Sequence, residues 1–325
     1  MSGFEHITAR AAVDALIPVE VSREIIKSVP TANPLMQLAR RMPNMSAAQV
    51  RMPMFGSSPY AYFVAGDTGL KQTTEVNWTN KYIDAEEIAV ILPIPLSVIA
   101  DADYDIWGEA RPEIEKAFSQ AIWGAVAYGT NIPATWTTNL GGAGITAVAT
   151  TAGNVASIAG FTDLYEAIAG ESADGEADGL LMTLEADGYM ATGHIADVAM
   201  RGRLRNCRDA DGNLIFSRSL QDRTRFELDG APVYIPTDGS VVAASGLDIA
   251  GQWDQLVYAI RQDMTYQIFD EGVISDGSGH VVLNLMQQDS AALRCVMRLG
   301  FALPNPPNPM NETDATRCPF SILTA

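Results

Sequence analysis

Residues 251–274 read GQWDQLVYAIRQDMTYQIFDEGVI, and residues 289–306 read DSAALRCVMRLGFALPNP. In the second stretch every second residue is apolar: Leu293, Cys295, Met297, Leu299 and Phe301. Apolar residues at every second position are typical of a strand with one buried face. The first stretch has an apolar run over 256–260 and then a similar alternation over 264–268. The two stretches therefore predict two long strands, and neither carries an obvious catalytic group.

The composition indicates a folded globular protein. The chain has 325 residues, of which 47% are hydrophobic and 18% charged, and this is enough for one large or two ordinary domains. No apolar run reaches the ~20 residues of a membrane-spanning helix, and the N-terminus does not resemble a secretion signal. The formal net charge of −18 argues against a surface that binds a phosphate backbone over its whole extent.

The first segment, residues 1–45, is predicted to be an arm. It contains short helix-like pieces, such as 19–29 and 33–42, and these are interrupted by Pro18, Pro30, Pro34 and Pro43. Proline at such intervals ends a helix before it can build a core of its own. We expect either a packed terminus or an arm that contacts other molecules.

Residues 46–90 are predicted to form a long hairpin. Val50, Met52 and Met54 alternate on the outgoing strand, and the apolar residues between Ile88 and Ile94 alternate on the return. The loop predicted between them, 55–87, would project from the body, and it carries the aromatic residues Tyr60, Tyr62, Phe63, Trp78 and Tyr82. An isolated ribbon buries such residues poorly, so we expect a neighbouring copy of the chain to cover them.

A long helix is predicted over residues 103–129. Its apolar positions recur at gaps of three and four and so mark one buried stripe, made by Trp107, Ala110, Ile114, Phe118, Ala121, Ala125 and Tyr128. Asp103 or Asp105 can cap its start and Gly129 its end. The Gly/Ala/Thr-rich run 131–156 that follows predicts a linker or an irregular excursion.

The composition then shifts, and residues 157–250 read as a domain of their own. Its first part, 161–188, contains eight acidic residues and no basic one, whereas 201–225 contains seven arginines and three aspartates. Opposite patches on identical subunits can meet head to tail and close into a ring. We therefore expect the arginine-rich segment, with Arg201, Arg203 and Arg205, to contact the acidic segment of a neighbouring copy.

Little in the sequence indicates catalysis. The three histidines and three cysteines share no metal-ligand spacing, and no nucleophile elbow or phosphate-binding loop is complete. Three cysteines without such spacing suit a reducing cytosol. We expect no enzyme, no metal and no cofactor.

The order of these parts resembles the major capsid proteins of tailed bacteriophages, which share the Hong Kong ninety-seven fold. The resemblance includes Gly230, Pro232, Val233 and Asp238 in ELDGAPVYIPTDGS, and it covers nearly the whole chain. The late strand is also similar to the family's pattern, through Arg294, Arg298 and Pro304.

The resemblance implies an α+β fold with five parts. These are an N-terminal arm (1–45), an E-loop hairpin (46–90), a P-domain with the spine helix (91–156), an A-domain (157–250), and P-domain return strands with the C-terminus (251–325). At the subunit interfaces we expect Tyr60, Tyr62, Phe63, Lys71, Trp78, Lys81 and the three arginines of 201–205. Some family members join a loop lysine to a neighbour's asparagine, and Lys71, Lys81, Asn305 and Asn308 are the matching residues here.

The function that the resemblance implies is self-assembly, through pentamers and hexamers, into an icosahedral shell around double-stranded phage DNA. The protein would be made in the host cytoplasm and reside in the virion, with a scaffolding protein, a portal and a decoration protein as possible partners. DNA would be enclosed without sequence-specific contact, and no membrane is implied. The alternatives are an encapsulin-type cellular compartment and, with less support, a cytosolic enzyme whose site is not visible in the sequence.

Overall fold

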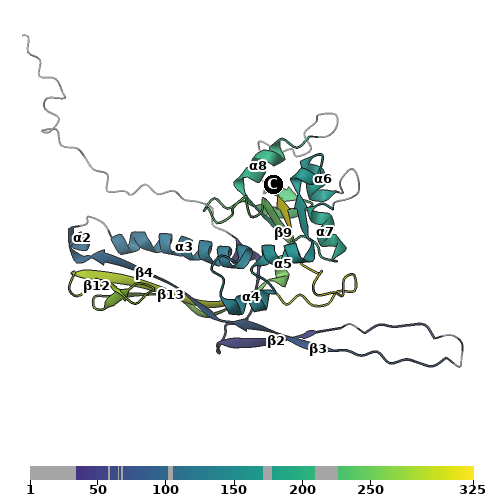
Figure 1. Cartoon of the computed structure of the whole chain (residues 1–325), viewed down its shortest axis with the longest axis horizontal. Helices are drawn as coiled ribbons and strands as arrows, with labels where there is room; N and C mark the ends of the chain where they lie inside the picture. The colour runs from purple at the N-terminus through teal and green to yellow at the C-terminus, as the bar shows by residue number, and fades with distance from the viewer. Residues whose placement is uncertain are drawn as a thin grey trace, which may run out of the picture.

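The computed structural model describes residues 34–57, 59–64, 66, 69–101, 105–170, 178–208 and 226–325. Most of the predicted arm, and the arginine-rich stretch after residue 208, therefore lie outside the described residues. Figure 1 shows an elongated half with a long helix, a more compact half beside it, and a ribbon that leaves the body.

A four-stranded sheet runs along the elongated half in the order β1-β10-β13-β4. Its strands are β1 (Arg40–Arg41), β10 (Val257–Phe269), β13 (Ser290–Ala302) and β4 (Glu86–Pro95). The two stretches quoted first are β10 and β13, and they pair antiparallel from Val257↔Ala302 to Phe269↔Ala292. As the alternation predicts, one face of β13 is buried, while Arg298 on the other face donates to Glu87 of β4 at 2.8 Å.

Helix α3 (Ile106–Tyr128) is the predicted spine helix, and it lies along the four-stranded sheet (Figure 1). The Asp105 side chain accepts a hydrogen bond from the backbone of Trp107, and Gly129 ends the helix with φ 69°. The buried residues differ in part from the predicted stripe, because Ile122, Trp123 and Val126 are buried whereas Ala121 is exposed.

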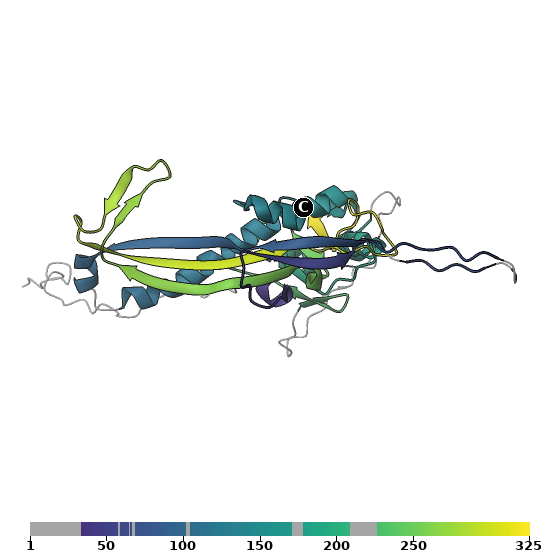
Figure 2. The ribbon, with the colours of Figure 1, turned by 90° about the horizontal axis from the view of Figure 1, so that it is seen from below.

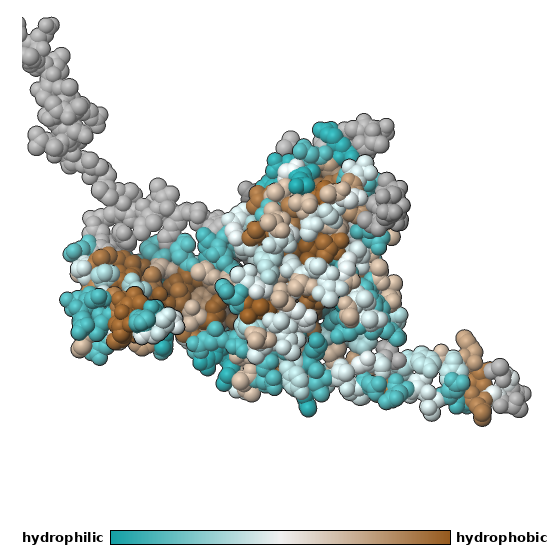
Figure 3. All heavy atoms as spheres, viewed as in Figure 1, coloured by the Kyte–Doolittle hydropathy of each residue, from teal (hydrophilic) through white to brown (hydrophobic). Residues whose placement is uncertain are grey.

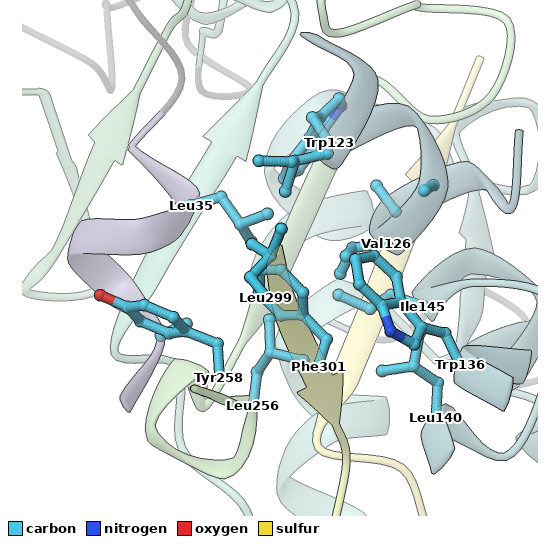
Figure 4. Close-up of a cluster of buried hydrophobic side chains, with 14 of the residues drawn as sticks. Leu35, Trp123, Val126, Trp136, Leu140, Ile145, Leu256, Tyr258, Leu299 and Phe301 are labelled. Atoms are coloured by element: carbon cyan, nitrogen blue, oxygen red, sulfur yellow. The ribbon is translucent and has the colours of Figure 1, made fainter. Parts of the chain in front are cut away.

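The main core lies between the C-terminal half of α3 and the four-stranded sheet. Figure 4 shows Trp123 and Val126 of α3 above Leu299 and Phe301 of β13. Trp136 completes this core, with its ring edge-to-face against that of Phe301 at 5.3 Å between centroids.

The run 131–156 is not an irregular linker, as the sequence analysis expected, but forms α4 (Ala134–Leu140) and α5 (Ile145–Ala152). Glycines in the left-handed conformation end both helices, at Gly141 and Gly153. The helices are short and rich in threonine, so they carry little apolar periodicity. Thr150 bonds to a carbonyl four residues back, while tertiary packing of Ile145 and Ala149 holds α5 in place.

A six-stranded sheet forms the compact half, in the order β5-β14-β9-β6-β8-β7. Its strands are β5 (Val155–Ser157), β14 (Phe320–Thr324), β9 (Asp248–Gly251), β6 (Gly193–Ala196), β8 (Ala231–Tyr234) and β7 (Phe226–Leu228). Helices α6 (Leu164–Ala169), α7 (Leu180–Ala186) and α8 (Val198–Arg205) pack with it, and η3 (Ile158–Gly160) follows β5.

The strand β14 was not expected. The sequence analysis assigned all of residues 251–325 to the return strands and C-terminus of the other half, yet Phe320–Thr324 pairs with β5 and β9 inside the six-stranded sheet. The proline-rich segment before it, residues 303–319, forms no strand and carries the chain from one sheet to the other. A proline-rich approach hides a strand of five residues from a search for periodicity.

The projecting hairpin has a different partner strand from the one that was predicted. Strand β2 (Gln49–Phe55) pairs with β3 (Trp78–Asp84), from Gln49↔Asp84 to Phe55↔Trp78, and β4 instead pairs with β13. The residues of β3 are largely polar and exposed on both faces, so they show no alternation. The alternation of 88–94 belongs to a strand of the main sheet.

The remaining elements are short. They are α1 (Leu35–Leu38), α2 (Leu96–Asp101), η4 (Trp253–Gln255), and the hairpin β11 (Val273–Ser275) with β12 (Val281–Asn284). Figure 2 shows the hairpin at the opposite end of the elongated sheet from the β2–β3 ribbon.

Candidate assembly surfaces

The ribbon, defined here as residues 49–84, extends beyond the body (Figures 1 and 2). Beyond the paired part of β2 and β3, the two sides stay together through few contacts. Asn77 donates from its backbone to the Ser57 hydroxyl at 3.2 Å, and the Tyr62 hydroxyl donates to the Gln72 carbonyl at 2.8 Å. Such a ribbon has little core of its own.

Its apolar side chains are consequently open to solvent. Phe63 is fully exposed and Leu70 is 89% exposed. Trp78 is 65% exposed, although its ring centroid lies 4.3 Å from that of Phe55. Tyr60 and Tyr62 are exposed as well. Figure 3 shows apolar surface close to the end of the ribbon. A group of uncovered aromatic side chains marks an interaction surface.

The two ribbon lysines lie in different places. Lys71 is exposed near the far end, whereas Lys81 lies near the base and lines a cavity of about 250 Å³ together with Asn305 and Asp314. The Asn305 amide already donates to the Arg317 carbonyl, and that of Asn308 donates to the Asp187 carbonyl. Both asparagine amides therefore have partners within the chain.

The three arginines predicted at an interface lie on α8, whose start is capped by Asp197. Arg203 and Arg205 are exposed near the C-terminal end of the helix, whereas Arg201 is half-buried and interacts within the chain. Cations are favoured at a helix C-terminus. Arg203 and Arg205 are thus the two whose side chains are presented to solvent.

The acidic segment has several roles in its own fold. Asp163 caps α6 by accepting from the Glu166 backbone at 3.0 Å, and Glu166 in turn accepts from the Thr162 backbone. Asp187 is buried. Asp178 and Glu185 are exposed, and residues 171–177 lie outside the described part of the chain.

A buried polar network, not found by sequence reasoning, holds the segment that crosses between the sheets. Arg317 is 2% exposed and donates to the side chain and carbonyl of Asn305, to the Asn311 carbonyl and to Asp314. Asp187 accepts from Asn311 at 2.6 Å. It also accepts from Asn154 and from the Cys318 backbone. The partners of Asp187 lie up to 131 positions away in the sequence, so no local pattern predicts them, whereas those of Arg317 lie within 12 positions.

A second buried pair lies in the six-stranded sheet. His194 of β6 and Asp248 of β9 are both fully buried, with 2.9 Å between Nδ1 and Oδ2. Because no solvent reaches the pair, it stabilises the fold and is not positioned to act on a substrate. Among the described residues, no group of three or more histidine, cysteine, aspartate or glutamate side chains could hold a metal ion.

The three cysteines Cys207, Cys295 and Cys318 are free and buried. Burial raises the pKa of the Cys318 thiol to about 12, so this group stays protonated and unreactive. Within the described part of the chain, no helix is both long and apolar enough to span a membrane.

The hairpin end of the elongated half exposes a second apolar surface, which sequence reasoning missed. Figure 3 shows it over α2, β4 and β12. Its exposed residues include Leu96, Val98, Val273, Val281, Val282 and Met286. The two ends of the elongated half thus each present apolar side chains.

Comparison with known proteins agrees with this arrangement. The major capsid protein of Staphylococcus phage 80alpha is 24% identical over 302 residues, which cover 91% of this chain and 84% of that protein. A solved structure from Microbacterium phage Oxtober96 is 30% identical with a TM-score of 0.79, over 98% of this chain and 99% of its own. Another, from Mycobacterium phage Adephagia, is 23% identical with a TM-score of 0.78 over 98% of both chains. The family model described as the phage capsid family matches residues 14–308, and the chain therefore belongs to the phage capsid family.

Proposed function

We propose that this protein is the subunit of an icosahedral shell, built through pentamers and hexamers, that encloses double-stranded phage DNA. The observation that supports the proposal most is the ribbon, whose aromatic side chains stay uncovered on the protomer. Many modest contacts made by one ribbon per subunit add up multivalently, so the assembled shell is stable although each contact is weak.

The charge of the protein suits this role. A formal net charge of −18 keeps packaged DNA from adhering to the wall, since like charges repel within a Debye length of about 8 Å at physiological salt. The buried cysteines and the buried His194–Asp248 pair have structural roles, and we infer that the protein is not a catalyst. A scaffolding protein, a portal and a decoration protein are the partners we expect, with synthesis and assembly in the host cytoplasm.

Electron microscopy of the purified protein tests the proposal. We expect closed shells with fivefold and sixfold capsomers, and nuclease-protected DNA in particles from infected cells. Shells that hold a protein cargo and no DNA would favour the encapsulin-type compartment instead. A solution of monomers at high concentration, without particles of any kind, would contradict both.

We also propose that α8 contacts the acidic segment of the next subunit in a capsomer. Arg203 and Arg205 are exposed on α8, and Asp178 and Glu185 are exposed in the acidic segment. The double variant Arg203→Glu with Arg205→Glu should lower the yield of capsomers at least tenfold, because like charges then face each other. The matched control is Arg261→Glu, at an exposed position of β10 outside the ribbon and α8, which should leave the yield unchanged. A normal yield from the α8 variant would contradict this contact.

A further inference from the structure

A cavity of about 250 Å³ lies where the base of the ribbon meets the body. The ribbon contributes Lys81 of β3, and the short helices contribute residues such as Gly141, at the end of α4, and Thr151 of α5. The segment 303–319 contributes Asp314 and Arg317. The cavity therefore joins three parts of the chain that are separate in the sequence.

Lys81 is half-buried beside this cavity, on the same face of β3 as the fully buried Ile83. Among the described residues, its ammonium group forms neither an ion pair nor a hydrogen bond. A cation that has lost part of its water without gaining an acidic partner is unfavourable. An anion that enters the cavity would supply the missing partner.

Arg317 is the second cation of the cavity, and its side chain is held in one position. It is 2% exposed and donates to the side chain and carbonyl of Asn305, to the Asn311 carbonyl and to Asp314. A guanidinium has five N–H groups, and these bonds use all but one of them. The remaining N–H, on Nη1, has no acceptor among the described residues.

The charge of the cavity is opposite to that of the chain. Lys81 and Arg317 give two positive charges and Asp314 gives one negative charge, so the lining has one net positive charge, whereas the whole chain carries −18. By contrast, a cavity of about 270 Å³ between α3 and β4 is lined by two glutamates and no basic residue. Charges that line a cavity act together on an ion inside it, because its walls screen them less than bulk water does.

We propose that the cavity at the base of the ribbon binds a small oxyanion, such as inorganic phosphate, between Lys81 and Arg317. Lysine and arginine side chains bind oxyanions through charge-assisted hydrogen bonds. A free anion fits better than the backbone of a nucleic acid, since a net charge of −18 repels a polyanion more strongly than a small ion.

The bound anion would tie the ribbon to the body at a point further along β3 than the buried Ile83. The inference goes beyond the proposed function and does not depend on it, because every group of the site belongs to one copy of the chain.

Calorimetric titration of the unassembled protein with inorganic phosphate, at constant ionic strength, tests the site. We expect saturable binding by the wild-type protein. Lys81→Gln should weaken this binding about tenfold or more, because a charge-assisted contact is lost, whereas Lys81→Arg should retain it. The matched control is Lys71→Gln, which should bind as the wild-type protein does, since Lys71 is exposed near the far end of the ribbon and does not line the cavity.

Asp314→Asn gives a test of opposite sign. The Asp314 carboxylate pairs with Arg317 at 3.1 Å and is 76% exposed. Removing its negative charge should strengthen phosphate binding about threefold or more, because the carboxylate repels an anion in the same cavity. Urea denaturation checks that the variant is folded. An unchanged or weaker affinity in the folded variant would count against the site.

Two further results would overturn the proposal. One is the absence of saturable phosphate binding by the wild-type protein, and the other is an equal loss of binding in Lys81→Gln and Lys71→Gln. A short DNA oligonucleotide is the second probe, and we expect no binding of it that depends on Lys81. Oligonucleotide binding that Lys81→Gln abolishes would assign the site to nucleic acid and overturn the free anion. None of these results affects the proposed function, which electron microscopy of shells tests separately.

Discussion

Two segments of this molecule run for about twenty residues without regular structure, and they are held in opposite ways. The segment 303–319 crosses between the two sheets and is held by buried hydrogen bonds of Arg317 and Asp187. The outer ribbon, residues 56–77, has few internal contacts and exposes its aromatic side chains. One segment is therefore covered within the protomer, and the other leaves its aromatic side chains exposed there.

This comparison separates two kinds of residue that look alike in the sequence. Both segments are rich in polar residues, with five prolines in 303–319 and three glycines in 56–77, and neither shows periodicity. The difference lies in burial, because hydrogen bonds within its own segment hold Arg317 in a buried position, whereas Phe63 stays exposed on the protomer. Variants of the first kind should change the stability of the protomer, and variants of the second kind should change assembly.

The largest effect should come from Arg317→Ala. The change leaves Asn305 and Asn311 carbonyls without a donor inside the protein. We expect the free energy of unfolding to fall by about 3–5 kcal/mol, as when one member of a buried charged network is removed. Urea denaturation of the unassembled protein measures this change.

The matched control is Arg298→Ala, which removes a partly exposed ion pair with Glu87. It should cost only about 0–1 kcal/mol. Equal losses for the two variants would show that burial does not decide the energetics of the crossing segment.

A smaller effect is expected for Tyr266→Phe, which tests how α3 is held on its sheet. The Tyr266 hydroxyl donates to Glu115 of α3 at 3.2 Å. The loss of this hydrogen bond should cost about 1 kcal/mol at pH 7, measured by the same urea denaturation. A variant as stable as the wild-type protein would show that the bond does not secure the helix.

The same variant predicts a pH dependence. Desolvation, together with the nearby Glu115 carboxylate, raises the pKa of Tyr266 from 10.0 to about 12. A raised pKa in the folded state gives a stabilisation that is present below about pH 10 and is lost as the pH rises through 12. The wild-type protein should therefore lose more stability than Tyr266→Phe between pH 10 and 12. Parallel stability curves in that window would contradict the assignment.

The smallest effect on the protomer should come from Trp78→Ala in the ribbon. Its main ring contact is with Phe55, and most of its surface is exposed, so the unfolding free energy should change by less than about 1 kcal/mol. Shell yield should nevertheless fall clearly, as measured by sedimentation. A large loss of protomer stability with normal shells would reverse the distinction between the two segments.

The sequence predicts the elements whose pattern is local. The strands β10 and β13 follow from alternation, and α3 follows from its apolar repeat and its caps Asp105 and Gly129. The family and its α+β fold were also predicted from the order of the parts. The two strands and the helix share one property, which is that each depends on neighbours within a few positions along the chain.

The remaining features depend on distant partners. Strand β3 is largely exposed on one face and buries only Ile83 on the other, so its pairing with β2 leaves little trace in periodicity. Ala121 follows the repeat of α3, yet it is exposed, beside Glu86 and Trp136 of other elements. Arg317 and Asp187 read as surface charges until the fold brings asparagines around them. The candidate interface residues stay predictions, because the protomer alone contains no partner.

The pairing of β4 with β13 has a consequence for how the polypeptide reaches its native state. Glu87 and Arg298 lie 211 positions apart, so every strand of the compact half except β14 must be looped out before β4 and β13 can join. The entropy cost of closing so large a loop comes before the strand contacts can stabilise the chain. Proteins dominated by contacts between residues distant in sequence therefore fold slowly. We expect folding of the monomer, and not association between monomers, to limit how fast particles accumulate after expression is induced. Chaperones that bind incompletely folded chains should then raise the number of particles more than a higher rate of protein synthesis does.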